Sequence, residues 1–216
     1  MSGTEILEIL NSHERDSHIT FDEGPHIYTI DGNSDFTSVT TVGGSHFNQF
    51  DSAKILANLS RKEGSKYHNM TDEEILAIWD KNRDDAATAG TLMHADIEHF
   101  YNHQFGKIKT SGSIEFGYFK QFNDDFVRRQ NSEINTKSLE MRPYRTEWMI
   151  YDLEVRIAGS IDMTFIDKNG DIHIYDWKRC KKIEKCNRFN KSAKTSFLEH
   201  LPDTNYWHYA LQLNIY

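Results

Sequence analysis

Apolar residues recur every three or four positions over much of the chain, a spacing typical of helices with one buried face. Residues 71–74, Thr-Asp-Glu-Glu, form a capping box, and Ile75, Ile78 and Trp79 follow it on one face. The helices predicted by this pattern cover residues 4–11, 51–61, a segment that opens at 71, 85–103, 114–130 and 203–216. A stripe of core residues is predicted on the helix 114–130, at Phe116, Phe119, Phe122 and Phe126.

The apolar spacing shortens to two residues in other parts of the chain, which indicates strands. His26, Tyr28 and Ile30 alternate up to the turn sequence Asp31-Gly32-Asn33, and three strand-like runs follow one another between residues 146 and 176. Helices first, then a strand meander and then a helix predict an α+β fold, not a doubly wound sheet.

The composition is that of a folded protein. The 216 residues are 38% hydrophobic and include 13 Phe, 10 Tyr and 4 Trp, and this length favours a single domain over residues 1–216. No apolar run approaches the roughly 18 residues that cross a membrane. Residues 1–10 lack the basic residues of a secretory signal, and Cys180 and Cys186 are too few for a disulfide framework. We therefore expect a reducing, intracellular compartment, cytoplasmic or nuclear.

The charge is distributed unevenly along the chain. Residues 178–194 contain eight Lys or Arg and one acid, a local charge of +7 in a chain of −8, so the remaining residues carry −15. A solvated lysine-rich loop is one interpretation of this run. Binding of a phosphate backbone is the other, with candidate contacts at Arg179, Lys181 and Lys182.

The loop between the second and third strand-like runs decides which residues share a face of the sheet. A two-residue Asn169-Gly170 turn would place Asp162 and Asp176 on opposite faces. A three-residue loop that begins at Lys168, with Gly170 in the left-handed conformation, would place Asp162 directly across from Asp176. The same register places Ser160 across from Lys178.

The three-residue loop would create a chemically distinctive face. Directly opposed residues have Cβ atoms about 4.5–5.5 Å apart, and two carboxylates at that distance repel unless a cation or a proton lies between them. One or two carboxylates suffice to bind Mg²⁺, which keeps several of its waters. Lys178 would point to the same side as Asp162 and Asp176, where it could act on a water or a phosphate. A surface salt cluster of these three residues is the alternative.

These residues resemble the motifs of the PD-(D/E)XK nucleases. Residues 159–162, GSID, followed by residues 176–178, DWK, are similar to the family pattern G-x-x-D … (D/E)-x-K. Residues 90–98, GTLMHADIE, are similar to the G-T-x-x-H-x-x-x-E helix of the RecB-like and lambda-exonuclease-like branch, and residues 212–216, QLNIY, to its Q-x-x-x-Y helix. The resemblance covers about residues 86–216 and implies a restriction-endonuclease-like core, a mixed central β-sheet flanked by helices. Residues 1–85 would precede it as a helical and strand region of the same domain.

The resemblance implies a Mg²⁺ or Mn²⁺ site with catalytic residues Asp162, Asp176 and Lys178. The two aspartates would hold the metal, with His94 and the backbone carbonyl of Trp177 as further ligands. Lys178 would serve the attacking water. For His94, an ordinary core or surface histidine is the alternative.

Two further acids are candidates by the same resemblance. Glu98 lies four residues after His94 on one helix face, where orienting the helix is its alternative role. Glu147 lies on the strand before Asp162, where some relatives carry an extra acid. A structural acid at the sheet edge is the alternative for Glu147.

The resemblance also implies contacts with DNA. Residues 36–42 are similar to an S-V-T-x-(V/L) segment of many relatives, whose hydroxyls could bind phosphate, and Ser160 matches a serine that holds a terminal 5′-phosphate in lambda-type enzymes. The pair Gln212 and Tyr216 corresponds to residues near the scissile phosphate. Ordinary strand hydroxyls and a helix-packing pair are the alternatives. The phosphate candidates outside the basic run are thus Ser38, Ser160, Gln212 and Tyr216.

The sequence therefore predicts a metal-dependent DNA nuclease. It favours an exonuclease that acts from duplex ends with a 5′-phosphate over an endonuclease. A restriction-type endonuclease of the same superfamily and a non-cleaving module that binds DNA ends are the alternatives. The Q-x-x-x-Y helix counts against the first and the intact Asp–Asp–Lys set against the second. The chain stops at Tyr216 within a helix, so we expect the domain to continue. The branch includes ring-shaped homo-oligomers and virus-encoded enzymes, and both options stay open.

Overall fold

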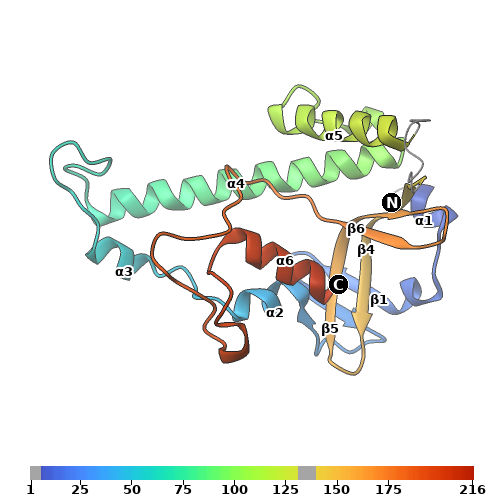
Figure 1. Ribbon diagram of the computed structural model, residues 1–216, viewed down its shortest axis with the longest axis horizontal. Coiled ribbons are helices and arrows are strands. Elements are labelled where there is room, and N and C mark those ends of the chain that lie inside the picture. Colours follow the sequence, from blue (N-terminus) through green and yellow to red (C-terminus); the bar gives the residue numbers. More distant parts are fainter. Residues whose placement is uncertain (1–5, 131–139) are drawn as a thin grey trace.

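The fold is a mixed sheet with helices packed around it, as a computed structural model of the chain shows (Figure 1). The structure describes residues 6–130 and 140–216. The central sheet contains β3 (Thr37–Ser38), β4 (Arg142–Asp152), β5 (Ile157–Ile166) and β6 (Ile172–Tyr175). Strand β5 pairs with the other three: antiparallel with β4 and β6, and parallel with β3. The α+β class predicted from the sequence is confirmed.

A separate ribbon of two strands lies at the N-terminal side of the sheet. It consists of β1 (Ile19–Asp22), which the sequence analysis did not identify, and β2 (Ile27–Ile30). Short helices precede it, α1 (Ile6–Leu10) and the 3₁₀ turn Glu14–His18. The buried Arg145 of β4 holds this region in place, because its guanidinium lies 2.7 Å from Asp16 and also donates to the backbone carbonyl of Asn11.

The longest element is α4 (Asp72–Tyr101), which continues through a boundary that the sequence analysis expected. Its capping box is confirmed, with Thr71 accepting from the backbone of Glu74. The separate helices predicted from 71 and over 85–103 are wrong, because they form one helix of 30 residues. Between them lie ion pairs one helical turn apart, Lys81 with Asp85 and Arg83 with Asp80, and neither Gly nor Pro interrupts them.

The remaining helices pack in two groups. In Figure 1, α5 (Ile114–Gln130) runs beside α4 above the sheet, and α2 (Val39–Ser45) and α6 (Asn205–Ile215) lie below α4. The short α3 (Ser52–Ala57) lies between α2 and α4, and the 3₁₀ turn Phe105–Lys107 lies between α4 and α5. A further 3₁₀ turn, Ser196–Leu198, precedes α6. The predicted helix 51–61 is therefore shorter than expected. Among the residues described, no helix is both long and apolar enough to span a bilayer.

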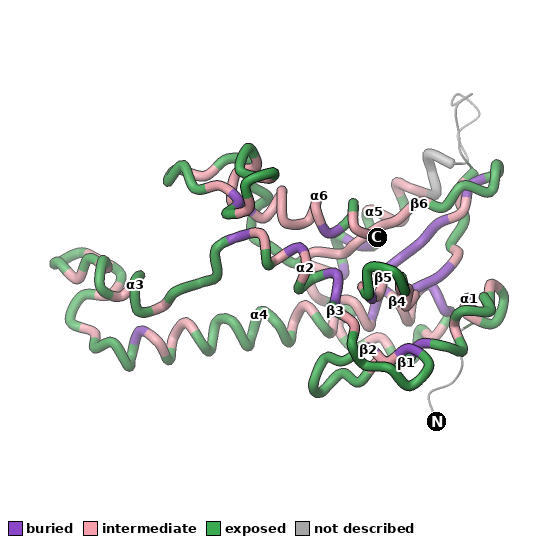
Figure 2. Tube along the Cα trace, turned by 90° about the horizontal axis from the view of Figure 1, so that it is seen from below, coloured by how far each residue is buried: buried purple, intermediate pink, exposed green. Residues whose placement is uncertain are grey.

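The main core lies between α4, α5 and the central strands. Figure 2 shows burial concentrated along the strands and the adjoining half of α4, whereas the half of α4 toward α3 is mostly exposed. Phe116 and Phe119 of the predicted stripe are buried, and Phe126 packs against them. The core prediction for α5 is thus confirmed at these three positions, whereas Phe122 is only half-buried and lines a cavity.

Gly159 on β5 allows α2 and α6 to approach the sheet closely. A Cβ atom at this position would lie 2.8 Å from the Tyr216 ring and 2.9 Å from the Val39 side chain. Both distances are shorter than van der Waals contact, so a larger residue would push these helices away. This close approach is the physical reason for glycine three residues before Asp162.

Asp96 of α4 fixes the connection between α4 and α5. Its carboxylate is 1% exposed and accepts the backbone N–H groups of Lys109 and Thr110 at 2.9 and 2.6 Å, and the Thr110 hydroxyl. Burial raises the pKa of Asp96, but these hydrogen bonds lower it more, so the pKa lies below its usual 3.8.

We expect Asp96→Asn to lower the free energy of unfolding by about 2 kcal/mol at neutral pH, because the amide places an NH₂ group against N–H donors. The depressed pKa means that the carboxylate stabilises the fold above about pH 4, and that this contribution is lost as the pH falls through the folded pKa. Urea unfolding of both proteins at neutral pH and near about pH 3 measures the effect. A stability difference that does not narrow in acid would contradict the assignment.

Candidate metal centre

The β5–β6 hairpin has the register that the three-residue loop requires. Met163 pairs with Tyr175 and Ile166 with Ile172, and Gly170 has a φ of +90°. The loop is closed by hydrogen bonds between Asp167 and Asp171 and from Gly170 to Asp167. The prediction of this loop is confirmed. The regular ladder ends at Tyr175, and Asp176 follows as the next residue in the same register as Asp162.

Three side chains from three elements converge beside this hairpin. His94 of α4, Glu147 of β4 and Asp162 of β5 each offer one ligand atom, and these atoms all lie within 4.8 Å of one another. The Nδ1 atom of His94 lies 3.6 Å from a carboxylate oxygen of Glu147 and 3.6 Å from one of Asp162. This arrangement can hold a divalent cation through one nitrogen and two carboxylates.

Glu147 reaches the cluster through an unusual backbone conformation. Its φ is +42°, a left-handed value that non-glycine residues rarely adopt. The neighbouring residues Thr146 and Trp148 pair with Met163 and Ile161, so Glu147 stands opposite Asp162 without a ladder pair of its own. Its other carboxylate oxygen accepts the Ser160 hydroxyl at 3.1 Å. The structure thus brings Glu147 into the site as fully as His94 and Asp162.

Trp177 connects Asp162 to His94 through its backbone. Its N–H donates to Asp162 at 2.6 Å, and its carbonyl oxygen lies 2.8 Å from Nε2 of His94. A carbonyl only accepts, so Nε2 carries a proton, and in neutral His94 the lone pair is on Nδ1, which faces the two carboxylates. Histidine ligands commonly donate their second N–H to a carbonyl in this way. The Trp177 carbonyl, predicted as a ligand, is therefore placed to orient His94.

The cluster is electrostatically strained without a cation. Burial raises the pKa of Asp162 to about 7, although the charge of His94 lowers it; the charges of Asp176 and Glu147 raise it further. Burial alone would lower the pKa of His94, but the contact with Glu147 and the charges of Asp162 and Glu147 raise it above 6.5. Neighbouring negative charge thus raises both pKa values, whereas burial raises that of Asp162 and lowers that of His94.

Asp176 lies beside this cluster with partners of its own. Its side chain is 4% exposed, and its two oxygens lie 2.9 and 3.0 Å from Nζ of Lys178. Gln212 donates to the same carboxylate at 3.1 Å and to the Tyr216 hydroxyl at 3.3 Å, and that hydroxyl donates to the Ser160 carbonyl at 2.7 Å. The structure therefore places Gln212 and Tyr216 at the site, as positioning groups for Asp176 and β5.

Three other predicted phosphate contacts have partners outside the cluster. Ser38 is buried and caps α2 by accepting the backbone N–H of Thr41. Arg179 pairs with Glu115 of α5, and Lys182 pairs with Glu184, both at 2.9 Å. Such surface pairs contribute little to stability, so both cations can exchange their partner for a phosphate.

A cavity of about 670 Å³ opens beside the cluster. Its walls include His94, Glu147 and the predicted Glu98, which therefore faces the approach to the site, together with Glu23. Three carboxylates around one opening attract a cation. The sequence indicated both Glu147 and Glu98 as further candidate acids, and the structure places Glu147 in the cluster and Glu98 on the cavity wall.

The donor set suits Mn²⁺ at least as well as Mg²⁺. Carboxylate oxygens fit both ions, whereas an imidazole nitrogen is a softer donor than the oxygens that Mg²⁺ prefers.

Comparisons of the chain with protein-family models, with curated proteins and with solved structures find no match. The geometry of this cluster and the sequence motifs are therefore the guides to function.

Proposed function

We propose that the chain is a Mg²⁺- or Mn²⁺-dependent DNA nuclease with a core of the PD-(D/E)XK type. One observation carries the proposal: His94, Glu147 and Asp162 converge within 4.8 Å, and the Asp176–Lys178 pair lies next to them. A purely structural salt cluster would gain little by assembling Glu147 and Asp162 around one histidine, with the buried Asp176 beside them. The order of the motifs along the chain supports the same reaction class.

Each residue has a defined role in this proposal. His94, Glu147 and Asp162 would hold the cation, which stabilises the charge that develops on the attacked phosphate. Trp177 fixes Asp162 and His94 through its N–H and carbonyl, and Gln212 fixes Asp176. The ammonium of Lys178 would neutralise charge on the phosphate while water adds to phosphorus and the phosphodiester P–O bond breaks.

The finer part of the proposal is exonuclease action from an end that carries a 5′-phosphate. The basic segment 178–194 continues directly from the site and supports binding of the adjoining strand. The Ser160 hydroxyl donates to Glu147, and the Lys178 ammonium contacts Asp176. A terminal phosphate would replace these carboxylates as the partner of both groups. This exchange predicts tighter binding of a doubly charged terminal phosphate than of an internal one.

The test compares three labelled DNA substrates with Mg²⁺, with Mn²⁺ and with EDTA. They are a linear duplex with a 5′-phosphate, the same duplex with a 5′-hydroxyl, and a covalently closed circle. We expect metal-dependent release of nucleotides from the linear duplexes, fastest with the 5′-phosphate and slower as salt rises. Rapid cutting of the circle would identify an endonuclease. Binding of ends without cleavage in either metal would identify a DNA-end-binding module and overturn the proposal.

A further inference from the structure

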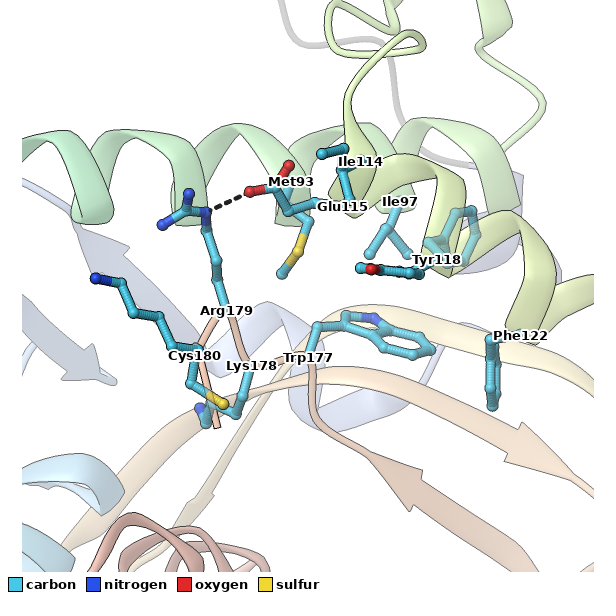
Figure 3. A pocket seen from close by; sticks show the side chains of 12 residues that line it. Met93, Ile97, Ile114, Glu115, Tyr118, Phe122, Trp177, Lys178, Arg179 and Cys180 are labelled. Atoms are coloured by element: carbon cyan, nitrogen blue, oxygen red, sulfur yellow. Dashed lines mark hydrogen bonds and ion pairs between the residues drawn. The ribbon is translucent and has the colours of Figure 1, made fainter. Parts of the chain in front are cut away.

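A second cavity adjoins the candidate metal centre on the side of α5. It has a volume of about 430 Å³, within the roughly 300–1,000 Å³ typical of small-ligand sites. Its apolar wall includes Met93, Ile97, Tyr118 and Phe122, and Figure 3 shows the Tyr118 ring and the Trp177 indole directed toward the same space.

Several residues that line this cavity also contact the metal cluster or adjoin it in the chain. The indole of Trp177 lines the cavity, whereas the carbonyl of the same residue contacts His94. Met93 lines the cavity and directly precedes His94, and Lys178 lines it while contacting Asp176. A group bound in the cavity would therefore lie next to a phosphate at the metal centre.

The aromatic wall is held firmly on one side and open on the other. Trp177 packs nearly perpendicular to Phe119 and Phe122, with centroids 5.9 and 5.4 Å away. Tyr118 is 69% exposed, although its neighbour Phe119 is buried. A fixed indole and an exposed phenol at one opening suit a flat aromatic ligand that enters from solvent.

The rim of the cavity is basic. Lys178, Arg179 and Lys181 line it together with one acid, Glu115, and Arg179 pairs with Glu115 at 2.9 Å (Figure 3). Lys178 and Arg179 each pair with one carboxylate, of Asp176 and Glu115, and an apolar peptide would add no anionic partner for the three cations of the rim. A ligand that is aromatic at one end and anionic at the other satisfies both the wall and the rim.

We propose that this cavity is a base pocket, which takes the nucleobase of an unpaired nucleotide adjoining the phosphate at the metal centre. Tyr118 and Trp177 stack on the base, and Arg179 and Lys181 hold the phosphate of that nucleotide. The inference rests on the proposed nuclease function and adds a substrate class to it: DNA ends with unpaired nucleotides. Stacking on aromatic side chains tolerates any base, so the pocket selects single-stranded character, not sequence.

The test measures binding without cleavage, in Ca²⁺ or in EDTA. The probe is a duplex with a short single-stranded tail that carries 2-aminopurine, prepared with a 5′ tail and with a 3′ tail, beside a blunt duplex with the same base paired. We expect quenching of the tail fluorescence and tighter binding of one tailed duplex than of the blunt one. Tyr118→Ala should weaken binding of that tailed duplex about tenfold and leave the blunt duplex unchanged.

Phe50→Ala is the matched control, because Phe50 is 70% exposed and lies against Trp79, away from this cavity. It should bind both duplexes like the wild type. Equal loss of affinity in both variants, or no loss in Tyr118→Ala, would overturn the base pocket while cleavage by the wild type still supports the nuclease. A wild type that neither binds nor cleaves DNA would overturn both. A change of oligomeric state in Tyr118→Ala, seen by light scattering, would assign the cavity to a protein interface instead.

Discussion

Replacing Asp162 by Asn is expected to lower metal-dependent DNA cleavage by at least about a thousandfold, because the lost ligand removes several kcal/mol of transition-state stabilisation. Mn²⁺ affinity, measured by calorimetry, should fall as well. The fold should survive, since an Asn oxygen can still accept the Trp177 N–H that Asp162 accepts at 2.6 Å. The metal-free variant should be no less stable than the wild type, because one of three neighbouring negative charges is removed.

Glu154→Gln is the control for Asp162→Asn. Glu154 lies exposed in the turn between β4 and β5, so the substitution removes one acid from the same hairpin without touching the cluster. It should retain cleavage and Mn²⁺ binding. Near wild-type cleavage by Asp162→Asn would remove Asp162 from the site, and unaltered Mn²⁺ affinity together with lost cleavage would move the metal to other ligands.

Local sequence predicted the central hairpin but allowed either a two-residue or a three-residue loop, and only the three-residue loop brings Asp162, Asp176 and Lys178 to one face. Gly170 tolerates the left-handed conformation that a three-residue loop requires, and the loop alone sets the register of β5 against β6. In that register Asp162 on β5 lies directly opposite Asp176, one residue beyond the end of β6. The capping box at Thr71 and the phenylalanine stripe of α5 were predictable for the same reason, because each depends on residues close in the chain.

Features that depend on distant pairings were not predictable. Glu147 faces Asp162 because β4 and β5 pair along their length, and its φ of +42° follows from that tertiary context. Strand β1, Ile19–Asp22, does alternate apolar and polar residues, but four residues are too few for this alternation to identify a strand, and its pairing with β2 depends on the fold. Residues 80–85 look like an ordinary polar break in the sequence, but they contain neither Gly nor Pro, and α4 continues through them with exposed ion pairs one helical turn apart.

The partners of Asp176 show the same limit at the site itself. The spacing of Gln212 and Tyr216 indicates a shared helix face, but it cannot show which group that face meets. In the structure Gln212 donates to Asp176, and Tyr216 donates to the backbone of β5. These hydrogen bonds give α6 a role in positioning the carboxylate of Asp176. The family resemblance had implied contact with DNA for the same two residues.

Lys178→Met is expected to reduce single-turnover cleavage by about a hundredfold or more, the usual cost of removing one group that stabilises transition-state charge. Methionine keeps the length of the side chain and removes only its charge and donors. Mn²⁺ affinity should remain, because an ammonium supplies no ligand and His94, Glu147 and Asp162 are untouched. Calorimetry and rapid-quench assays on the same preparation separate the two quantities.

Lys182→Met is the comparison that isolates the position of the Lys178 charge. Lys182 belongs to the same basic segment, but its ammonium pairs with Glu184 and its side chain is 75% exposed. Its loss should raise the DNA concentration needed for half-maximal rate and leave the maximal rate unchanged, since a phosphate contact away from the reaction stabilises bound substrate and transition state equally. Lys178→Met should instead lower the maximal rate itself. If Lys178→Met instead abolishes Mn²⁺ binding, the ammonium that contacts both oxygens of the buried Asp176 organises the carboxylates, and its role is structural.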